Sequence, residues 1–115
     1  MEDKVYTMRG NNFPKDKFVQ AMDKYVLAEL VAVREKEVAG IPVTLYCFEK
    51  YFLRNNCYAA VSVLVTEEES ATEVDIVTSA GGEGIFNFKW GTHKSLARDT
   101  VEVLSKFGFI EETSE

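Results

Sequence analysis

Residues 43–66 read VTLYCFEKYFLRNNCYAAVSVLVT, and this stretch decides the fold. Both of its halves are rich in β-branched and aromatic residues, which favour extended strands. Asn55-Asn56 separates the halves, and asparagine is typical of tight turns because it tolerates positive φ angles. The stretch therefore predicts two antiparallel strands, over residues 43–53 and 57–66, joined by a short turn.

Further β-prone segments flank this hairpin on both sides. Residues 4–9 predict an opening strand, and another strand begins at Leu30 and ends before Ala39-Gly40. Residues 72–79 alternate between apolar and charged positions, which is typical of a half-buried strand. Aromatic and polar residues also alternate over 86–90, which predicts one more extended segment.

Two segments show the spacing of amphipathic helices. The first follows Asn11-Asn12-Phe13-Pro14, where asparagine caps a helix and proline is tolerated in the first turn. The second follows Thr92, a good capping residue, and ends at Gly108, a natural C-cap. Their apolar stripes are Phe18, Ala21, Met22, Tyr25 and Val26 in the first, and Leu96, Ala97, Thr100, Val101, Leu104 and Phe107 in the second.

These elements predict one two-layer α+β domain over residues 1–115. We expect an antiparallel sheet of about five strands with two helices on one of its faces. The acidic residues 108–115 are expected to form a frayed tail.

Large side chains occupy both faces of the predicted central strand. One side carries Val43, Leu45 and Tyr51, and the other carries Tyr46, Phe48 and Phe52. A sheet that is apolar on both faces must cover its second face, and self-association is a common way to do so. The sequence thus predicts a homodimer. The alternative is that these aromatic residues line a broad edge of the core.

The charge balance bears on possible partners. Nineteen acidic residues against thirteen basic ones give a net charge of −6, which disfavours nucleic acids and anionic membranes as partners. No apolar run reaches the length of about 20 residues that a membrane helix needs, and the N-terminus shows no signal peptide. We therefore expect a cytoplasmic protein.

Two cysteines, Cys47 and Cys57, fit reduced thiols in that compartment. They are too few for a zinc site, and no other motif indicates a metal or cofactor. A tight hairpin turn places Cys57 near residues 53–54 and Cys47 near residues 63–64. The two cysteines are then separated by about 20 Å and should not form a disulfide.

Two stretches carry a resemblance to a known family. They are FEKYFLRNN at residues 48–56 and GGEGIFNFKWG at residues 81–91. The chain resembles a family of small uncharacterised proteins, chiefly from Firmicutes, that is classed as a domain of unknown function. A Phe-Asn-Phe-x-Trp-Gly element at residues 86–91 is the most specific part of this resemblance. The resemblance implies a bacterial, cytosolic protein of one domain, and it implies no activity.

The glycine-rich loop and the start of the last helix form the candidate ligand site. Backbone N–H groups of such a loop can surround an anion, and nearby lysines and a histidine add positive charge. The spacing matches neither a P-loop nor a dinucleotide fingerprint, so a plain connection between elements is the alternative. The candidate ligand-binding residues are Gly81, Gly82, Gly84, Lys89, Trp90, Thr92, His93 and Lys94.

No catalytic constellation is visible in the sequence. His93 is the single histidine, and nothing places Cys47 or Cys57 beside it as a nucleophile. We expect a non-enzymatic, self-associating binding or interaction module. One alternative is a protein that binds a small molecule or anion near the glycine loop and the final helix. A second alternative is an enzyme of unrecognised type.

Overall fold

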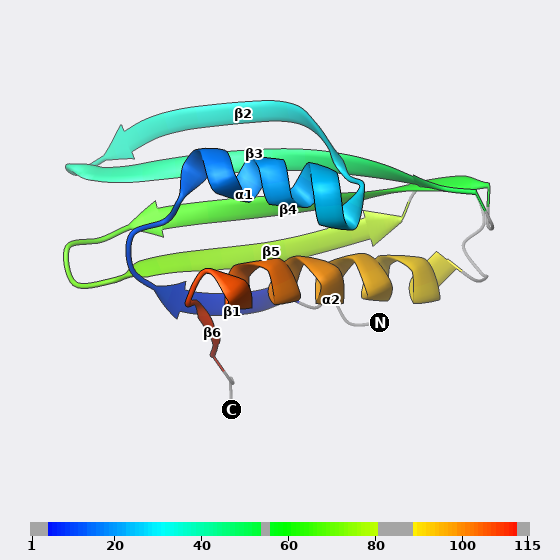
Figure 1. The fold of residues 1–115 in the computed structure, drawn as a ribbon. Coiled ribbons are helices and arrows are strands. Elements are labelled where there is room, and N and C mark those ends of the chain that lie inside the picture. Colours follow the sequence, from blue (N-terminus) through cyan, green and yellow to red (C-terminus); the bar gives the residue numbers. More distant parts are fainter. Residues whose placement is uncertain (1–4, 54–55, 81–88, 113–115) are drawn as a thin grey trace.

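A computed structural model describes residues 5–53, 56–80 and 89–112 of the chain (Figure 1). Within these residues the chain forms one six-stranded sheet, with its helices packed against one face. The elements in chain order are β1 (Val5–Gly10), α1 (Lys15–Ala21), the π-helical turn η1 (Met22–Val26), β2 (Glu29–Val38), β3 (Ile41–Phe52), β4 (Cys57–Glu67), β5 (Thr72–Ala80), α2 (Lys89–Lys106) and β6 (Ile110–Glu111).

The strand order across the sheet is β2-β3-β4-β5-β1-β6, and every neighbouring pair is antiparallel. The predicted α+β class, the antiparallel pairing and the two helices are therefore confirmed. The sheet has six strands instead of about five, because the short strand β6 adds to its edge beside β1.

The C-terminal end of α2 explains this extra strand. Gly108 has a φ of +93°, and its N–H donates to the Ser105 carbonyl at 3.1 Å. The N–H of Phe109 donates to the Leu104 carbonyl at 3.1 Å. Together these bonds form a Schellman motif, which ends the helix and reverses the chain. The predicted C-cap at Gly108 is thus confirmed.

The prediction of a frayed tail over residues 108–115 is wrong for its first part. Phe109 is buried in the core, and Ile110 pairs with Arg9 across β6 and β1. The N–H of Glu112 then donates to the Thr7 carbonyl at 2.8 Å. After the Schellman turn the chain runs along the free edge of β1, and backbone hydrogen bonds to β1 hold it there. Residues 113–115 lie outside the described residues.

The start of α2 also differs from the prediction. The helix begins at Lys89, so Lys89 and Trp90 are helical and Thr92 lies inside the helix instead of capping it. The extended segment predicted over residues 86–90 is therefore wrong for its last two residues. Residues 86–88 of the predicted segment lie outside the described residues.

The core lies between the helices and one sheet face. Buried side chains alternate with less buried ones along β3, β4 and the first part of β5, as period-two patterning requires. Phe18 packs edge-on against Phe48 at 5.7 Å between ring centroids, and Phe13 contacts Phe109 at 6.0 Å. The fully buried strand and helix residues include Val61, Val63, Val65, Val74, Ile76, Leu96 and Leu104.

The first helix does not keep its predicted stripe to the end. It widens into the π-helical turn η1, and Tyr25 is 64% exposed instead of buried. A π-turn adds a residue to the helical repeat, which rotates later side chains around the axis. The Tyr25 ring lies under the amines of Lys24 and Lys106, at 5.5 and 5.4 Å from its centroid. These contacts hold the ring at the outer surface of the helical layer.

Candidate interaction surface

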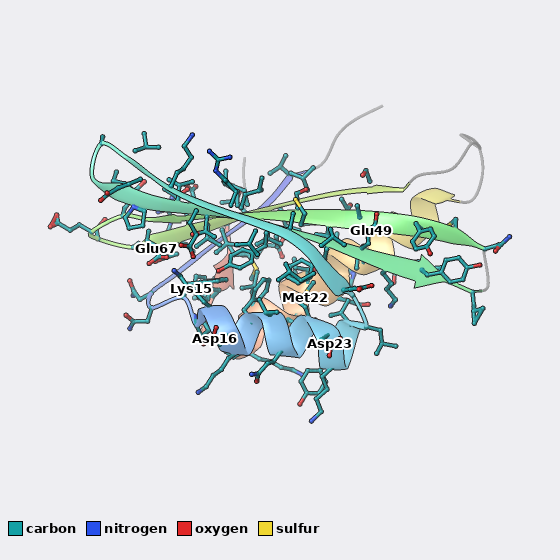
Figure 2. The ribbon with its side chains drawn as sticks, turned by 90° about the horizontal axis from the view of Figure 1, so that it is seen from above. Lys15, Asp16, Met22, Asp23, Glu49 and Glu67 are labelled. Carbon is teal, nitrogen blue, oxygen red and sulfur yellow. The ribbon has the colours of Figure 1, made fainter. Side chains whose placement is uncertain are left out.

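The sheet has a second face that no described helix covers, which we call the open face. Figure 2 views the sheet along its edge, with α1 and most of α2 beneath it and side chains rising freely above it. On β4 the buried residues alternate with side chains that point to the open face, as neighbouring positions of a strand must. These side chains are Ala60, Ser62, Leu64 and Thr66.

The middle of the open face is apolar. Leu45 on β3 lies directly opposite Leu64 on β4, and Val43 and Cys47 flank Leu45 along the same strand. Leu45 is 36% exposed and Val77 on β5 is 43% exposed. Single exposed apolar side chains are ordinary, but a contiguous cluster at the centre of a sheet marks a surface that binds another surface.

Two tyrosines extend this apolar surface toward the turn between β3 and β4. Tyr51 and Tyr58 lie opposite each other, with ring centroids 4.9 Å apart. The Tyr51 hydroxyl donates a hydrogen bond to the Asn56 side-chain oxygen. Both rings are largely exposed. Such amphipathic rings are enriched at protein interfaces.

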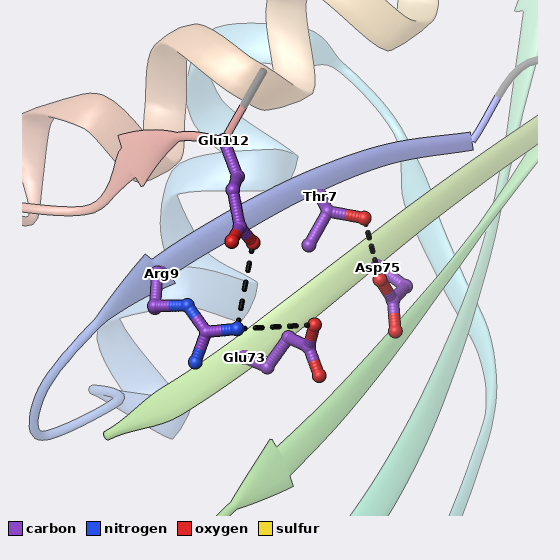
Figure 3. A network of polar contacts seen from close by, with 5 residues as sticks. All are labelled: Thr7, Arg9, Glu73, Asp75 and Glu112. Atoms are coloured by element: carbon purple, nitrogen blue, oxygen red, sulfur yellow. Dashed lines mark hydrogen bonds and ion pairs between the residues drawn. The ribbon is translucent and has the colours of Figure 1, made fainter. Parts of the chain in front are cut away.

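The β5–β1–β6 side of the open face is acidic (Figure 3). The Thr7 hydroxyl donates to Asp75 Oδ1 at 2.8 Å. Arg9 lies between two carboxylates, 3.6 Å from Glu73 and 3.5 Å from Glu112. The cluster thus contains three carboxylates and one guanidinium, and it keeps a net negative charge. These pairs are partly exposed, so each contributes only about 0–1 kcal/mol to stability.

The opposite side of the open face is basic. Arg34 and Lys36 on β2 lie opposite Leu45 and Val43 of β3, and so they share the open face with them. Within the described ranges neither side chain forms an ion pair. Glu35 between them points to the helical layer, where Lys15 of α1 pairs with it at 3.5 Å. Strand alternation therefore places Arg34 and Lys36 on the open face and Glu35 on the helical side.

The sequence reasoning missed these charged residues as a set. Their spacing by two residues was a visible signal, in Arg34 and Lys36 and again in Glu73 and Asp75. Their meaning depends on strand order, which places the two pairs on opposite sides of the apolar centre.

The predicted ligand site is only partly within the described residues. Gly81, Gly82 and Gly84 lie outside them. Positions 89–94, which include Lys89, Trp90, Thr92, His93 and Lys94, form the first turns of the α2 backbone. Farther along α2 the space against the sheet is filled, because Leu96 and Leu104 are fully buried. Anion binding at the glycine loop stays a prediction.

Other kinds of site find no support in the described ranges. No three His, Cys, Asp or Glu side chains among those residues gather closely enough to hold a metal ion. Cys57 is buried on the helical side, whereas Cys47 points to the open face, and both thiols are free. In the hairpin Cys57 lies opposite Phe52 and Cys47 lies opposite Ser62, which is one to two residues from the predicted register. None of the described helices has the length and apolar character to cross a membrane.

The fold and this surface define the chain as a small α+β protein with one uncovered, partly apolar sheet face. The model of a family of unknown function, DUF6054, matches residues 5–108, and the chain belongs to this family. The resemblance to a domain of unknown function is thus confirmed. No curated protein matches the chain. No solved structure matches it either.

Proposed function

We propose that this chain is a non-enzymatic interaction module that associates with a second copy of itself through the open face. The observation that carries the proposal is the leucine pair at the centre of that face, where Leu45 is exposed and Leu64, directly opposite, is half-buried. Burying these side chains between two sheets removes their apolar surface from water, which is worth about 25 cal/mol for each Å2.

The size of the open face suits such a dimer. Strands β2 to β5 span about 20 Å across and about 35 Å along the strands, or roughly 700 Å2. A standard stable interface buries about 800 Å2 of each partner. Two such sheets can pack face to face about 10 Å apart, as in a β-sandwich.

The free edge of β2 is a poorer route to association. Antiparallel pairing of two β2 strands about a two-fold axis sets residues of the same face opposite each other. A register centred on Glu35 places Arg34 against the partner's Lys36, and Glu35 against its own copy. A register centred on Lys36 sets Glu35 against the partner's Glu37. Like charges directly opposite destabilise a strand pair, so the proposal assigns association to the face.

The proposal keeps the bacterial origin and the cytoplasmic location that the sequence resemblance implies. Two free thiols, Cys47 and Cys57, support a reducing compartment.

Substitution of Leu45 by aspartate tests the proposal. A carboxylate at this position would be desolvated in the interface, so Leu45→Asp should be a folded monomer in light scattering. The matched control is Leu27→Asp, because Leu27 is also exposed but lies at the end of η1, on the helical side. That variant should remain a dimer, like the unmodified chain. Thermal melting followed by circular dichroism checks that both variants fold.

Two results would contradict the proposal. One is a monomeric mass for the unmodified chain at high micromolar concentration. The other is a folded Leu45→Asp variant that dimerises as well as the unmodified chain.

A further inference from the structure

We infer the geometry of this dimer: the two sheets stack about a two-fold axis that runs parallel to the strands, between β3 and β4. In this arrangement Arg34 and Lys36 of one copy meet the partner's Asp75 and the partner's Glu73. The inference rests on the proposed function, and it adds the orientation of the second copy and the residues that select it.

Charged side chains follow a regular order across the open face, from β2 to β5. Strand pairing aligns Arg34 (β2), Leu45 (β3), Leu64 (β4) and Asp75 (β5) in one row. The neighbouring row contains Lys36, Val43, Thr66 and Glu73 in the same strand order. Each row thus begins with a cation on β2, continues through uncharged side chains and ends with a carboxylate on β5.

The strand order also determines where a two-fold axis parallel to the strands can lie. β2 and β5 lie equally far from a line between β3 and β4. Rotation about that line keeps each row in place and exchanges its two ends. Arg34 then faces the partner's Asp75, and Leu45 faces the partner's Leu64. Lys36 likewise faces the partner's Glu73. Each contact occurs twice in the dimer, and the apolar centre is flanked by ion pairs on both sides.

The other aligned orientation of the two sheets has its two-fold axis perpendicular to the strands. An axis perpendicular to the strands, through the row of Cys47 and Ser62, would bring Arg34 near the acidic Glu29 of the partner. It would also place Leu45 over the partner's Glu49, which lies on the open face of β3. That contact desolvates a carboxylate against a leucine without a counter-charge, which is costly. The axis parallel to the strands avoids this contact.

Arg34 and Lys36 are also available to pair with carboxylates of a second copy. In the described part of the monomer neither of them forms an ion pair, whereas the acidic side already keeps an excess of carboxylates. Complementary charges at the rim of an interface select the orientation of the partner and suppress other orientations. The dimer should accordingly weaken as the salt concentration rises.

A charge-swap experiment tests the geometry. The basic side is reversed in Arg34→Glu/Lys36→Glu, and the acidic side in Glu73→Lys/Asp75→Lys. Each variant alone sets like charges opposite each other at all four of these contacts, so its dimerisation should weaken at least about tenfold. An equimolar mixture restores opposite charges at every contact, and it should form a heterodimer close to the affinity of the unmodified dimer. Sedimentation velocity measures all three samples.

The control variant, Lys17→Glu/Arg98→Glu, carries the same charge change as the basic-side variant on exposed helical positions. It should dimerise like the unmodified chain. The neutral variants Arg34→Gln and Asp75→Asn provide a second test if a charge reversal prevents folding, since each should weaken the dimer and flatten its salt dependence.

Two results would overturn the geometry while leaving self-association intact. One is normal dimerisation of Glu73→Lys/Asp75→Lys, which the perpendicular axis predicts. The other is a mixture that associates no better than its separate components. A monomeric unmodified chain would instead remove the proposed function itself.

Discussion

Tyr46 is the side chain whose ionisation the fold changes most clearly among the described residues. Burial, together with the negative charges of Glu35, Glu67 and Asp16, raises the pKa of its hydroxyl from an ordinary value of 10.0 to about 12. Above pH 10 the unfolded chain loses the Tyr46 proton, whereas the folded chain keeps it up to about pH 12. The free energy of unfolding should therefore fall as the pH rises through this window.

Urea unfolding at several pH values between 9 and 12 measures this effect, with Tyr46→Phe as the reference. A phenylalanine cannot ionise, so the unmodified chain should lose on the order of 2 kcal/mol relative to Tyr46→Phe across the window. All other ionisable groups are common to the two proteins, so their contributions cancel in the difference. Parallel pH profiles for the two proteins would show that Tyr46 is not perturbed.

Ala39 is a residue in a backbone conformation that does not suit it. Ala39 and Gly40 have φ values of +54° and +80° in the turn between β2 and β3, as a type I′ hairpin turn requires. Alanine pays a steric cost at positive φ, whereas asparagine tolerates it. Ala39→Asn should therefore raise the free energy of unfolding by about 0.5–1 kcal/mol in urea titrations.

The same titrations provide the control for this turn. Gly40→Ala should lower the stability, although a Cβ at this position meets no atom within 4 Å, so the loss would reflect backbone conformation alone. A destabilised Ala39→Asn would contradict the assignment of the turn.

At the scale of elements, the packing of β6 and the end of α2 against β1 depends on a glycine. A Cβ added to Gly10 would lie 2.7 Å from the ring of Phe109. The ring lies over the glycine because no side chain occupies the space. Gly10→Ala should displace the ring and lower the free energy of unfolding by about 1–3 kcal/mol.

A double-mutant cycle with Phe109→Leu isolates this contact. Gly10→Ala should cost less in the Phe109→Leu background, because the smaller side chain leaves room for the methyl group. An equal cost in both backgrounds, measured by chemical unfolding, would show that the penalty arises elsewhere than at the ring.

Elements with local signals could be predicted from the sequence, and elements with long-range causes could not. The hairpin over residues 43–66 and the C-cap at Gly108 follow from patterning and turn residues a few positions apart. β6 forms because β1 offers a free edge, and α2 already begins at Lys89, inside the stretch whose alternation predicted a strand. Neither fact is visible in a local window. The π-turn that exposes Tyr25 likewise has no sequence signature in the stripe.

At the scale of the whole molecule, the apolar part of the open face could be predicted from the sequence, whereas its charge distribution could not. The alternation of β3 predicted apolar side chains on both of its sides, and Leu45 and Tyr51 do lie on the open face. The net charge of −6 gave no hint that cations gather on β2 and carboxylates on β5 and directly after β6. That separation arises from the strand order, which brings segments about 40 residues apart to opposite sides of one surface.

The molar mass of the unmodified chain in solution tests the central claim most directly. Sedimentation equilibrium over a series of micromolar concentrations should show a mass that rises from 13.0 kDa to twice that value and then stays constant, as a closed two-fold dimer requires. A mass that remains at 13.0 kDa over the whole series would contradict self-association through the open face.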